Sequence, residues 1–426
     1  DAVGCAFASK RYDYSNTSFA AISELSGAGE HTVIGYQSKL PLRDAVLLNG
    51  ILAHGLDYDD THSAGVIHLT VSTFPTALGV AERIDASGRD LLTAYILGVE
   101  TGARIASVVK GGFHQVGFHP TGLIGAFASA LVAGRLQGLN AAQLAAAQGI
   151  TLSTGSGSLE FLEDGAWTKR MHPGWAGAAG ITAVALARQG FVGAKKAYEG
   201  RFGLYASHLD PASAKACDLG IATARLGVEW ETMNVAIKPF PACHFVHAAA
   251  DAAINLHRQG VRASDVVSVR ARVPAEVVKA VCEPVANKKR PASDYDAKFS
   301  IPFVVAASLI RGRFGLAELE PAMLADAQIL DLARRVEYEI DPESGFPKYY
   351  SGEVIVRMND GREIGDRQFM NRGCADRPIS NAEIQSKFFE NATMIMSRDR
   401  AERVCNAILA LDQLASVRQL SRVLGA

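Results

Sequence analysis

The most chemically dense part of the sequence is the run HGLDYDDTHSAGVIH, from His54 to His68. It carries three histidines and three aspartates directly after the apolar stretch AVLLNGILA. An α-helix repeats about every 3.6 residues. If a helix began at Ala45 and continued to about His62, Asp59 and Asp60 would point away from its other polar side chains. The face opposite that pair would then carry a polar group made of His54, Asp57, Tyr58 and Thr61.

A polar face at the end of an apolar helix suits the wall of a pocket, although a solvated helix end would look similar. Acidic residues at a helix C-terminus oppose the helix dipole, which favours a functional role. Three chemistries fit: a metal site, a clamp for a charged substrate, or acid–base catalysis with His68 or His62 as proton carrier. Metal binding is disfavoured because no EF-hand glycine follows and no HExxH motif is present.

Two further segments place histidine or lysine beside glycine and proline. GFHPTG sets His119 at the predicted start of a helix, where Pro120 suits the first turn and the helix N-terminus favours anions. DGAWTKRMHPGWAG is predicted to be a loop before an apolar helix. Its cations would form a carboxylate site. They are Lys169, Arg170 and His172.

A third segment, AIKPFPACHFVHAAADAA, puts Lys238 in a turn that prolines make rigid. Cys243, His244 and His247 then lead into a helix. Taken singly, Lys169 and Lys238 could be surface lysines and Cys243 a small core residue. No nucleophile elbow or phosphate loop accompanies these segments, and STGSGS lacks the spacing of a dinucleotide site. Together they indicate a small, multiply charged anion handled without a cofactor or a metal.

The remaining pattern predicts a mainly α fold with a large all-helical domain over residues 1–261 and 371–426. Helical spacing is clear over 91–109, 140–155 and 175–190. Alternation over 266–273 and 334–341, and on both sides of NDG in 352–366, predicts strands and a hairpin. With a buried helix predicted over 299–312, residues 262–370 form a smaller α+β domain, and helices return from Ser380.

The amino-acid composition limits the classes of binding partner that we expect for this chain. The net charge of −1 argues against broad attraction to nucleic acid or anionic lipid. The longest apolar stretch, GLIGAFASALVAG, is too short to span a bilayer. The six cysteines are scattered without a CxxC pair, which favours a reducing, cytoplasmic setting.

The four segments, in order, resemble the MmgE/PrpD family. Its pattern has an H-x-(L/M)-D-(Y/F)-D-D-T box, an F-H-P segment, a T-K-x-x-H-x-G loop and a K-x-(Y/F)-P segment, matched here by HGLDYDDT, GFHPTG, TKRMHPGWAG and KPFPACHFVH. The resemblance spans essentially the whole chain. It implies a helical domain with an α+β lid, commonly a homodimer, and a cleft that works without a cofactor. Family active-site positions correspond to Asp57, Thr61, His68, His119, Lys169 and Lys238.

The family includes 2-methylcitrate dehydratase, cis-aconitate decarboxylase and iminodisuccinate epimerase. Decarboxylase-type members have a histidine where this chain has Cys243, and a tyrosine where it has Phe303. These departures argue against decarboxylation and favour an epimerase of a small dicarboxylate, with dehydration as the alternative. A non-catalytic carboxylate-binding dimer is the third hypothesis.

We expect His68, with Asp57 orienting it or a neighbour, to move the proton, and the lysines to stabilise the anion. Substrate contacts are expected from Thr61, Tyr58, His172 and Cys243.

Overall fold

The computed structural model describes residues 1–425, and the chain is mainly helical. It divides into two compact units. The helical unit comprises residues 1–159, 168–235 and 380–426, and the second unit comprises 160–167 and 236–379. The predicted α+β segment 262–370 lies inside the second unit, which also takes in α13 (His247–Arg258). That residues 262–370 act as a lid stays a prediction.

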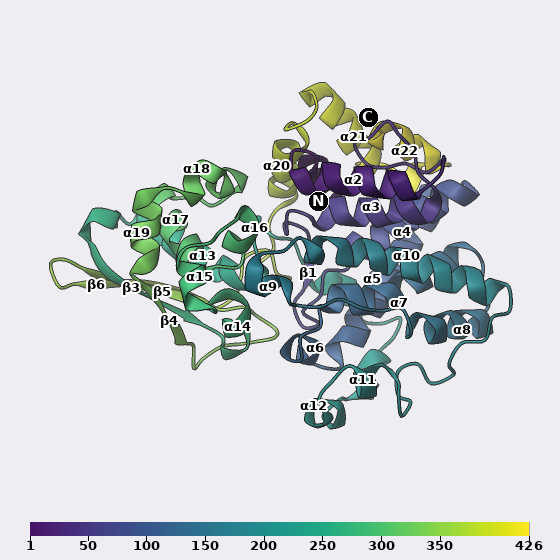
Figure 1. The fold of residues 1–426 in the computed structure, drawn as a ribbon, viewed down its shortest axis with the longest axis horizontal. Coiled ribbons are helices and arrows are strands. Elements are labelled where there is room, and N and C mark those ends of the chain that lie inside the picture. Colours follow the sequence, from purple (N-terminus) through teal and green to yellow (C-terminus); the bar gives the residue numbers. More distant parts are fainter. Residues whose placement is uncertain (426) are drawn as a thin grey trace. The chain divides into compact units, whose positions relative to one another are not determined.

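Long helices build the helical unit, and Figure 1 shows them side by side. The helices predicted over 91–109 and 140–155 are found within four residues of those bounds, whereas the helix predicted over 175–190 begins seven residues earlier, at Thr168. The main helices are α1 (Ala2–Ser9), α2 (Asp13–Leu25), α3 (Leu42–His54), α4 (Thr70–Ile84), α5 (Gly88–Ser107), α7 (Pro120–Leu136), α8 (Ala141–Thr151), α10 (Thr168–Arg188), α20 (Asn381–Ala392), α21 (Arg398–Leu409) and α22 (Arg418–Leu424). Shorter helices are α6 (Gly112–Gln115), α11 (Leu204–Ser207) and α12 (Pro211–Lys215).

Helices α3 and α10 cross at two glycines. A Cβ atom on Gly50 would lie 2.5 Å from the Cα of Gly174, and one on Gly174 would lie 2.0 Å from the carbonyl oxygen of Leu47. Both distances are shorter than a van der Waals contact, so no side chain fits at either position. The crossing brings the C-terminal end of α3 against the N-terminal turns of α10, where the predicted site residues lie.

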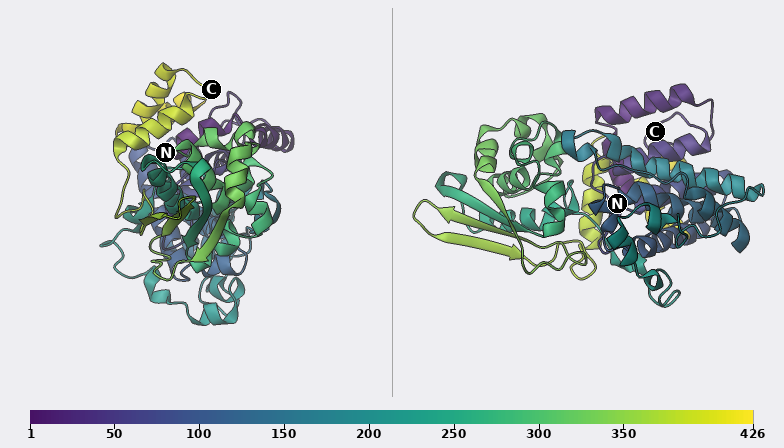
Figure 2. Two further views of the ribbon diagram at one scale, coloured as in Figure 1. Left: turned by 90° about the vertical axis from the view of Figure 1, so that its left-hand side faces the viewer. Right: turned by 60° about the horizontal axis from the view of Figure 1, so that its bottom comes forward.

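The second unit contains a four-stranded sheet in the order β4-β3-β5-β6. Its strands are β3 (Val266–Val273), β4 (Val336–Ile340), β5 (Gly352–Met358) and β6 (Glu363–Gln368). β3 pairs in parallel with β4 and antiparallel with β5, and β5 and β6 form the hairpin that the NDG turn predicted. Helices α13, α17 (Ile301–Arg311) and α19 (Ala327–Arg334) cover one face of this sheet (Figures 1 and 2). The predicted strands and the buried helix over 299–312 are confirmed.

Two predictions of local structure are wrong. α3 ends at His54 and does not continue to His62, and α10 begins at Thr168, so Lys169 and His172 lie on a helix and not in a loop. Within residues 1–425, no helix combines the length and the apolar character needed to cross a bilayer.

Candidate active site

The segment after α3 turns sharply instead of continuing as a helix. The amide of Asp57 donates to the carbonyl of His54, and Asp57 adopts a left-handed conformation with φ 51°. Thr61 and His62 then form the short strand β1. The single polar face expected from helical spacing therefore does not form. This turn brings Asp59, which the helical arrangement directed elsewhere, back to the end of α3.

Asp59 is the carboxylate that two histidines share. It is fully buried, and its oxygens lie 2.9 Å and 3.1 Å from His54 Nδ1 and 3.3 Å from His68 Nδ1. Burial alone would raise the pKa of Asp59, but the adjacent His54 and His68 hold it well below its usual value. An ionised Asp59 accepts the Nδ1 proton of His54. The Nε2 atom of His54 therefore carries a lone pair, and it is buried without a hydrogen-bond partner among residues 1–425.

His68 has the same tautomer for a separate reason. Its Nδ1 lies 2.7 Å from the carbonyl oxygen of Asp60 and 3.2 Å from Thr61 Oγ1. A carbonyl can only accept, so Nδ1 carries the proton and Nε2 is the basic nitrogen. The rings of His54 and His68 have centroids 4.9 Å apart. Two basic nitrogens are thus oriented by the same short segment.

Lys169, in the first turn of α10, bonds to Asp57. Its Nζ lies 2.9 Å from Asp57 Oδ2, and both side chains are buried. A buried ion pair needs good geometry to offset the loss of hydration, and this pair has it. The buried ammonium is therefore held near His54, His119 and His172, and its charge lowers the pKa of all three.

His119 and His172 form the other side of the group. His119 immediately precedes α7 and is followed by Pro120 at its first position, as predicted. The two Nδ1 atoms lie 2.9 Å apart, so one ring donates and the other accepts. Burial lowers the pKa of both histidines, that of His172 to about 4, and the Lys169 charge lowers them further. Both rings are therefore neutral near pH 7. We call His54, His68, His119 and His172 the histidine cluster.

Several residues in and around the histidine cluster were not predicted from the sequence. His54 and Asp59 were not selected as site residues, although their position in the opening segment pointed to them. Lys387 of α20 donates to the carbonyl of Tyr58 and lies 3.7 Å from the centre of its ring. No sequence signal connects residues 329 positions apart. Asp60 is also buried, and burial together with Asp59 raises the pKa of Asp60 to about 6.

Metal ligands are close enough to deserve a test. Nitrogens of His54, His68 and His119 lie within 4.8 Å of one another, and so do ligand atoms of His54, Asp57, Asp59 and His68. Imidazole suits zinc and other transition metals. However, Lys169 already supplies a cation to Asp57, and a second positive charge beside it would be repelled. The group that contains Asp57 is therefore poorly suited to a metal ion.

The remaining predicted residues belong to the second unit. Lys238 is fully buried, and Cys243 precedes the short helix His244–Val246 that leads into α13, as predicted. Two more lysines of this unit, Lys288 and Lys298, are also buried. That Lys238 and Cys243 meet the histidine cluster stays a prediction.

Residues 1–216 match the MmgE/PrpD N-terminal domain, and residues 240–413 match the MmgE/PrpD C-terminal domain. The chain belongs to the MmgE/PrpD family. Among its relatives, a cis-aconitate decarboxylase-like protein of Aspergillus oryzae is 26% identical over 99% of this chain and 90% of its own length. Human cis-aconitate decarboxylase is 27% identical over 91% of this chain and 80% of its own, and that of Aspergillus terreus is 25% identical over 100% and 89%.

Acid should destabilise the fold through the histidine cluster. The pKa of His54, His119 and His172 is lower in the folded chain than the ordinary 6.5, so the unfolded chain binds more protons as pH falls below 6.5. Asp60, with its pKa raised to about 6, acts in the opposite direction, but it is one group against three. We expect the melting temperature to fall from pH 7 to about 4, as measured by calorimetry.

The matched variant is His172→Gln, which keeps a hydrogen-bonding side chain but cannot take up a proton. We expect its melting temperature to fall less steeply over the same range. An acid dependence equal to that of the unmodified chain would contradict the assignment of His172 as a buried neutral imidazole.

Proposed function

We propose that this protein is a cofactor-independent acid–base enzyme that removes a proton from the carbon next to a carboxylate of a small di- or tricarboxylate. The observation that carries the proposal is the buried histidine cluster beside the Asp57–Lys169 ion pair. Such a site offers neutral bases and a fixed cation in one place. The names of the relatives agree with the substrate class, since cis-aconitate is a tricarboxylate.

His68 is the proposed base. Its Nε2 would take the proton from the substrate carbon, and the ionised Asp59, 3.3 Å from Nδ1, would stabilise the imidazolium that results. His54 has the same tautomer and a shorter contact with Asp59, so it is the neighbouring base if the substrate lies closer to it. The proton lost from carbon is thereby held on nitrogen until it is returned.

Lys169 would stabilise the enediolate formed when the proton leaves. A carbon acid next to a carboxylate is very weak, so the negative charge must meet a donor that is already in position. The Lys169 ammonium is fixed by Asp57 and needs no reorganisation during the reaction. His119 with His172, together with Thr61, would bind the carboxylates, and Tyr58 and Cys243 would line the substrate. Lys238 would add a second cation.

The fate of the enediolate distinguishes the possible reactions. In an epimerase, the preferred proposal, a proton returns to the opposite face of the same carbon. In a dehydratase, hydroxide leaves from the neighbouring carbon and is protonated to water. Decarboxylation is a second candidate because the named relatives are decarboxylases. It removes no proton from carbon: the C–C bond to a carboxylate breaks, carbon dioxide leaves, and the electron pair left on carbon takes a proton from a protonated histidine. The epimerase and the dehydratase would use the same base, and in all three reactions Lys169 would stabilise the negative charge.

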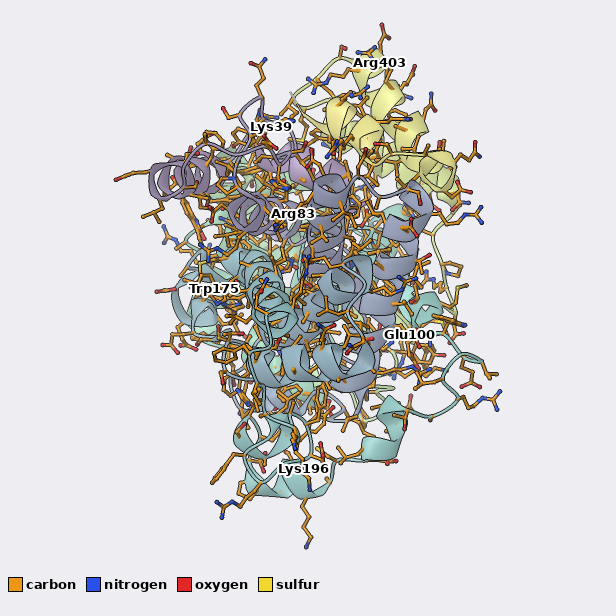
Figure 3. The ribbon with its side chains drawn as sticks, turned by 90° about the vertical axis from the view of Figure 1, so that its right-hand side faces the viewer. Lys39, Arg83, Glu100, Trp175, Lys196 and Arg403 are labelled. Carbon is orange, nitrogen blue, oxygen red and sulfur yellow. The ribbon has the colours of Figure 1, made fainter. Side chains whose placement is uncertain are left out.

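The resemblance also implies a homodimer, and we propose that α10 takes part in it. Met171, Trp175 and Leu186 lie on one stripe of this helix and are 44%, 47% and 38% exposed. Trp175 is labelled in Figure 3. A large aromatic residue within an exposed apolar stripe is typical of the centre of an interface.

Proton exchange in heavy water tests the proposed function. We expect candidate di- and tricarboxylates, screened one by one, to gain deuterium at the carbon next to a carboxylate, as followed by NMR. The same spectra separate an epimer from an unsaturated or a decarboxylated product. In Lys169→Met the exchange rate should fall about 10²–10³-fold, or about 3–4 kcal/mol. Binding of a carboxylate without exchange or turnover would instead support the non-catalytic carboxylate-binding dimer.

A second prediction concerns Asp59. Asp59→Asn keeps an acceptor for Nδ1 but removes the negative charge that stabilises the imidazolium, so kcat should fall about 10²–10⁴-fold with a smaller change in KM. Asp412→Asn, an exposed position, is the matched control and should leave kcat unchanged. Undiminished turnover in Asp59→Asn would remove Asp59 from the mechanism, and undiminished turnover in His68→Ala would transfer the role of base to His54.

The dimer has its own test. Trp175→Glu places a charge in the centre of the apolar stripe, so the proportion of monomer in sedimentation velocity runs should rise. Lys196→Glu, at an exposed position below Trp175 in the view of Figure 3, is the control. An unmodified chain that sediments as a monomer at all concentrations would contradict the proposal.

A further inference from the structure

A cavity of about 700 Å³ lies in the helical unit, away from the histidine cluster. Its walls come from residues 29–39, the C-terminal end of α4 and the helix α22. Sites for small molecules commonly have this size. His68 lies just before α4, whereas Arg83 lies 15 residues further along the chain, which corresponds to about 20 Å of helix. The cavity is therefore separate from the proposed active site.

Positive charge dominates the lining. Four cationic side chains, Lys39, Arg83, Arg418 and Arg422, face two carboxylates, Glu30 and Glu82. Of these four cations, Arg418 alone forms an ion pair within residues 1–425, with its Nη1 atom 3.6 Å from Asp85 Oδ2. The cations are thus held together without enough carboxylates to neutralise them.

The carboxylate of Glu82 is already engaged by the protein. Its two oxygens accept from the amide and the hydroxyl of Thr32, at 2.9 Å and 2.7 Å. Arg418 Nε donates to the backbone carbonyl of Glu82 at 3.2 Å, and this hydrogen bond fixes the Arg418 side chain at the wall of the cavity. The remaining guanidinium groups present planar, paired donors, which match phosphate and carboxylate oxygens.

Two buried polar atoms at this wall have no partner in the described chain. The Oγ of Ser421 is one, on a side chain that is only 5% exposed, and the Nδ1 of His31 is the other. Buried hydroxyl and imidazole groups are normally hydrogen-bonded. Both groups line the cavity, so a ligand oxygen placed there would supply the missing partner.

A second cavity of about 210 Å³ shares Arg422 and Gly425 with the first. It adds Arg400 and Arg403, and Arg400 is held by a hydrogen bond to the carbonyl of Gly425. Lys39, Arg83 and Arg403 all lie in the upper part of the view in Figure 3. The positive surface therefore continues beyond the first cavity.

We propose that this cavity binds a small molecule that carries at least two anionic groups, phosphates or carboxylates, at a site distinct from the one that performs the reaction. The cations supply the attraction, and Ser421 and His31 supply directed hydrogen bonds. The concave walls, built from three separate segments, suit a small ligand more than an extended one.

The test is calorimetric titration of the full chain with inorganic pyrophosphate and, separately, with citrate, at low ionic strength. We expect saturable one-site binding in at least one arm. The double variant Lys39→Ala/Arg83→Ala should bind at least tenfold more weakly, whereas the matched control Lys195→Ala/Lys196→Ala should bind like the unmodified chain. All four positions are exposed, so the fold should be retained. The double variant should also keep its turnover, because neither residue lies in the proposed active site.

Two more variants show whether a ligand binds in this cavity or in the proposed active site. Lys169→Met removes one cation of the proposed active site, so binding whose affinity is unchanged in this variant belongs to the cavity. Ser421→Ala removes a hydroxyl without a hydrogen bond, so affinity should fall about threefold while the melting temperature does not. Pyrophosphate binding would identify a phosphorylated ligand, and citrate binding that survives in Lys169→Met would identify a polycarboxylate. Absence of binding in both arms, or equal binding by the Lys39→Ala/Arg83→Ala variant, would overturn the proposal.

Discussion

The buried ion pair between Asp57 and Lys169 is the interaction on which the proposed site depends. It joins a left-handed turn to the first turn of α10 across 112 positions of sequence. Removing one partner would leave an uncompensated charge in the interior, which typically destabilises a fold by about 3–5 kcal/mol. The same pair fixes the path of the chain through Tyr58, Asp59 and Asp60. Structure and proposed chemistry therefore rely on one contact.

The pKa values of two neighbouring carboxylates in this turn, Asp59 and Asp60, are shifted in opposite directions. Two imidazoles hold the pKa of Asp59 well below its usual value, whereas burial beside Asp59 raises that of Asp60 to about 6. Groups whose pKa values are pushed apart in this way can act as base partner and as acid within one site. His119 and His172, from two other segments, add rings whose lowered pKa values keep them neutral. The site thus combines groups in different protonation states near pH 7.

The sequence predicted local structure well where the signal itself was local. Period-two alternation located β3, β5 and β6, and Pro120 marked the start of α7. The end of α3 was mispredicted because helical spacing says nothing about Asp57, whose left-handed turn accompanies a contact with a distant lysine. The role of Lys387 could not be predicted for the same reason. Membership of the family was predicted from four ordered motifs and is confirmed, whereas the choice among epimerase, dehydratase and decarboxylase depends on a substrate that the sequence does not name.

The discontinuous course of the chain has a consequence for biosynthesis. Helix α1 packs against α20, and the same apolar core joins residues near the N-terminus to Leu420 and Leu424. Helix α20 leaves the ribosome only after the whole second unit, which emerges at roughly 5–20 residues per second. Throughout that interval α3 can cover one side of α1, but the side that packs against α20 stays exposed. Nascent chains of this protein should therefore be clients for chaperones that shield hydrophobic surface until α20 has emerged.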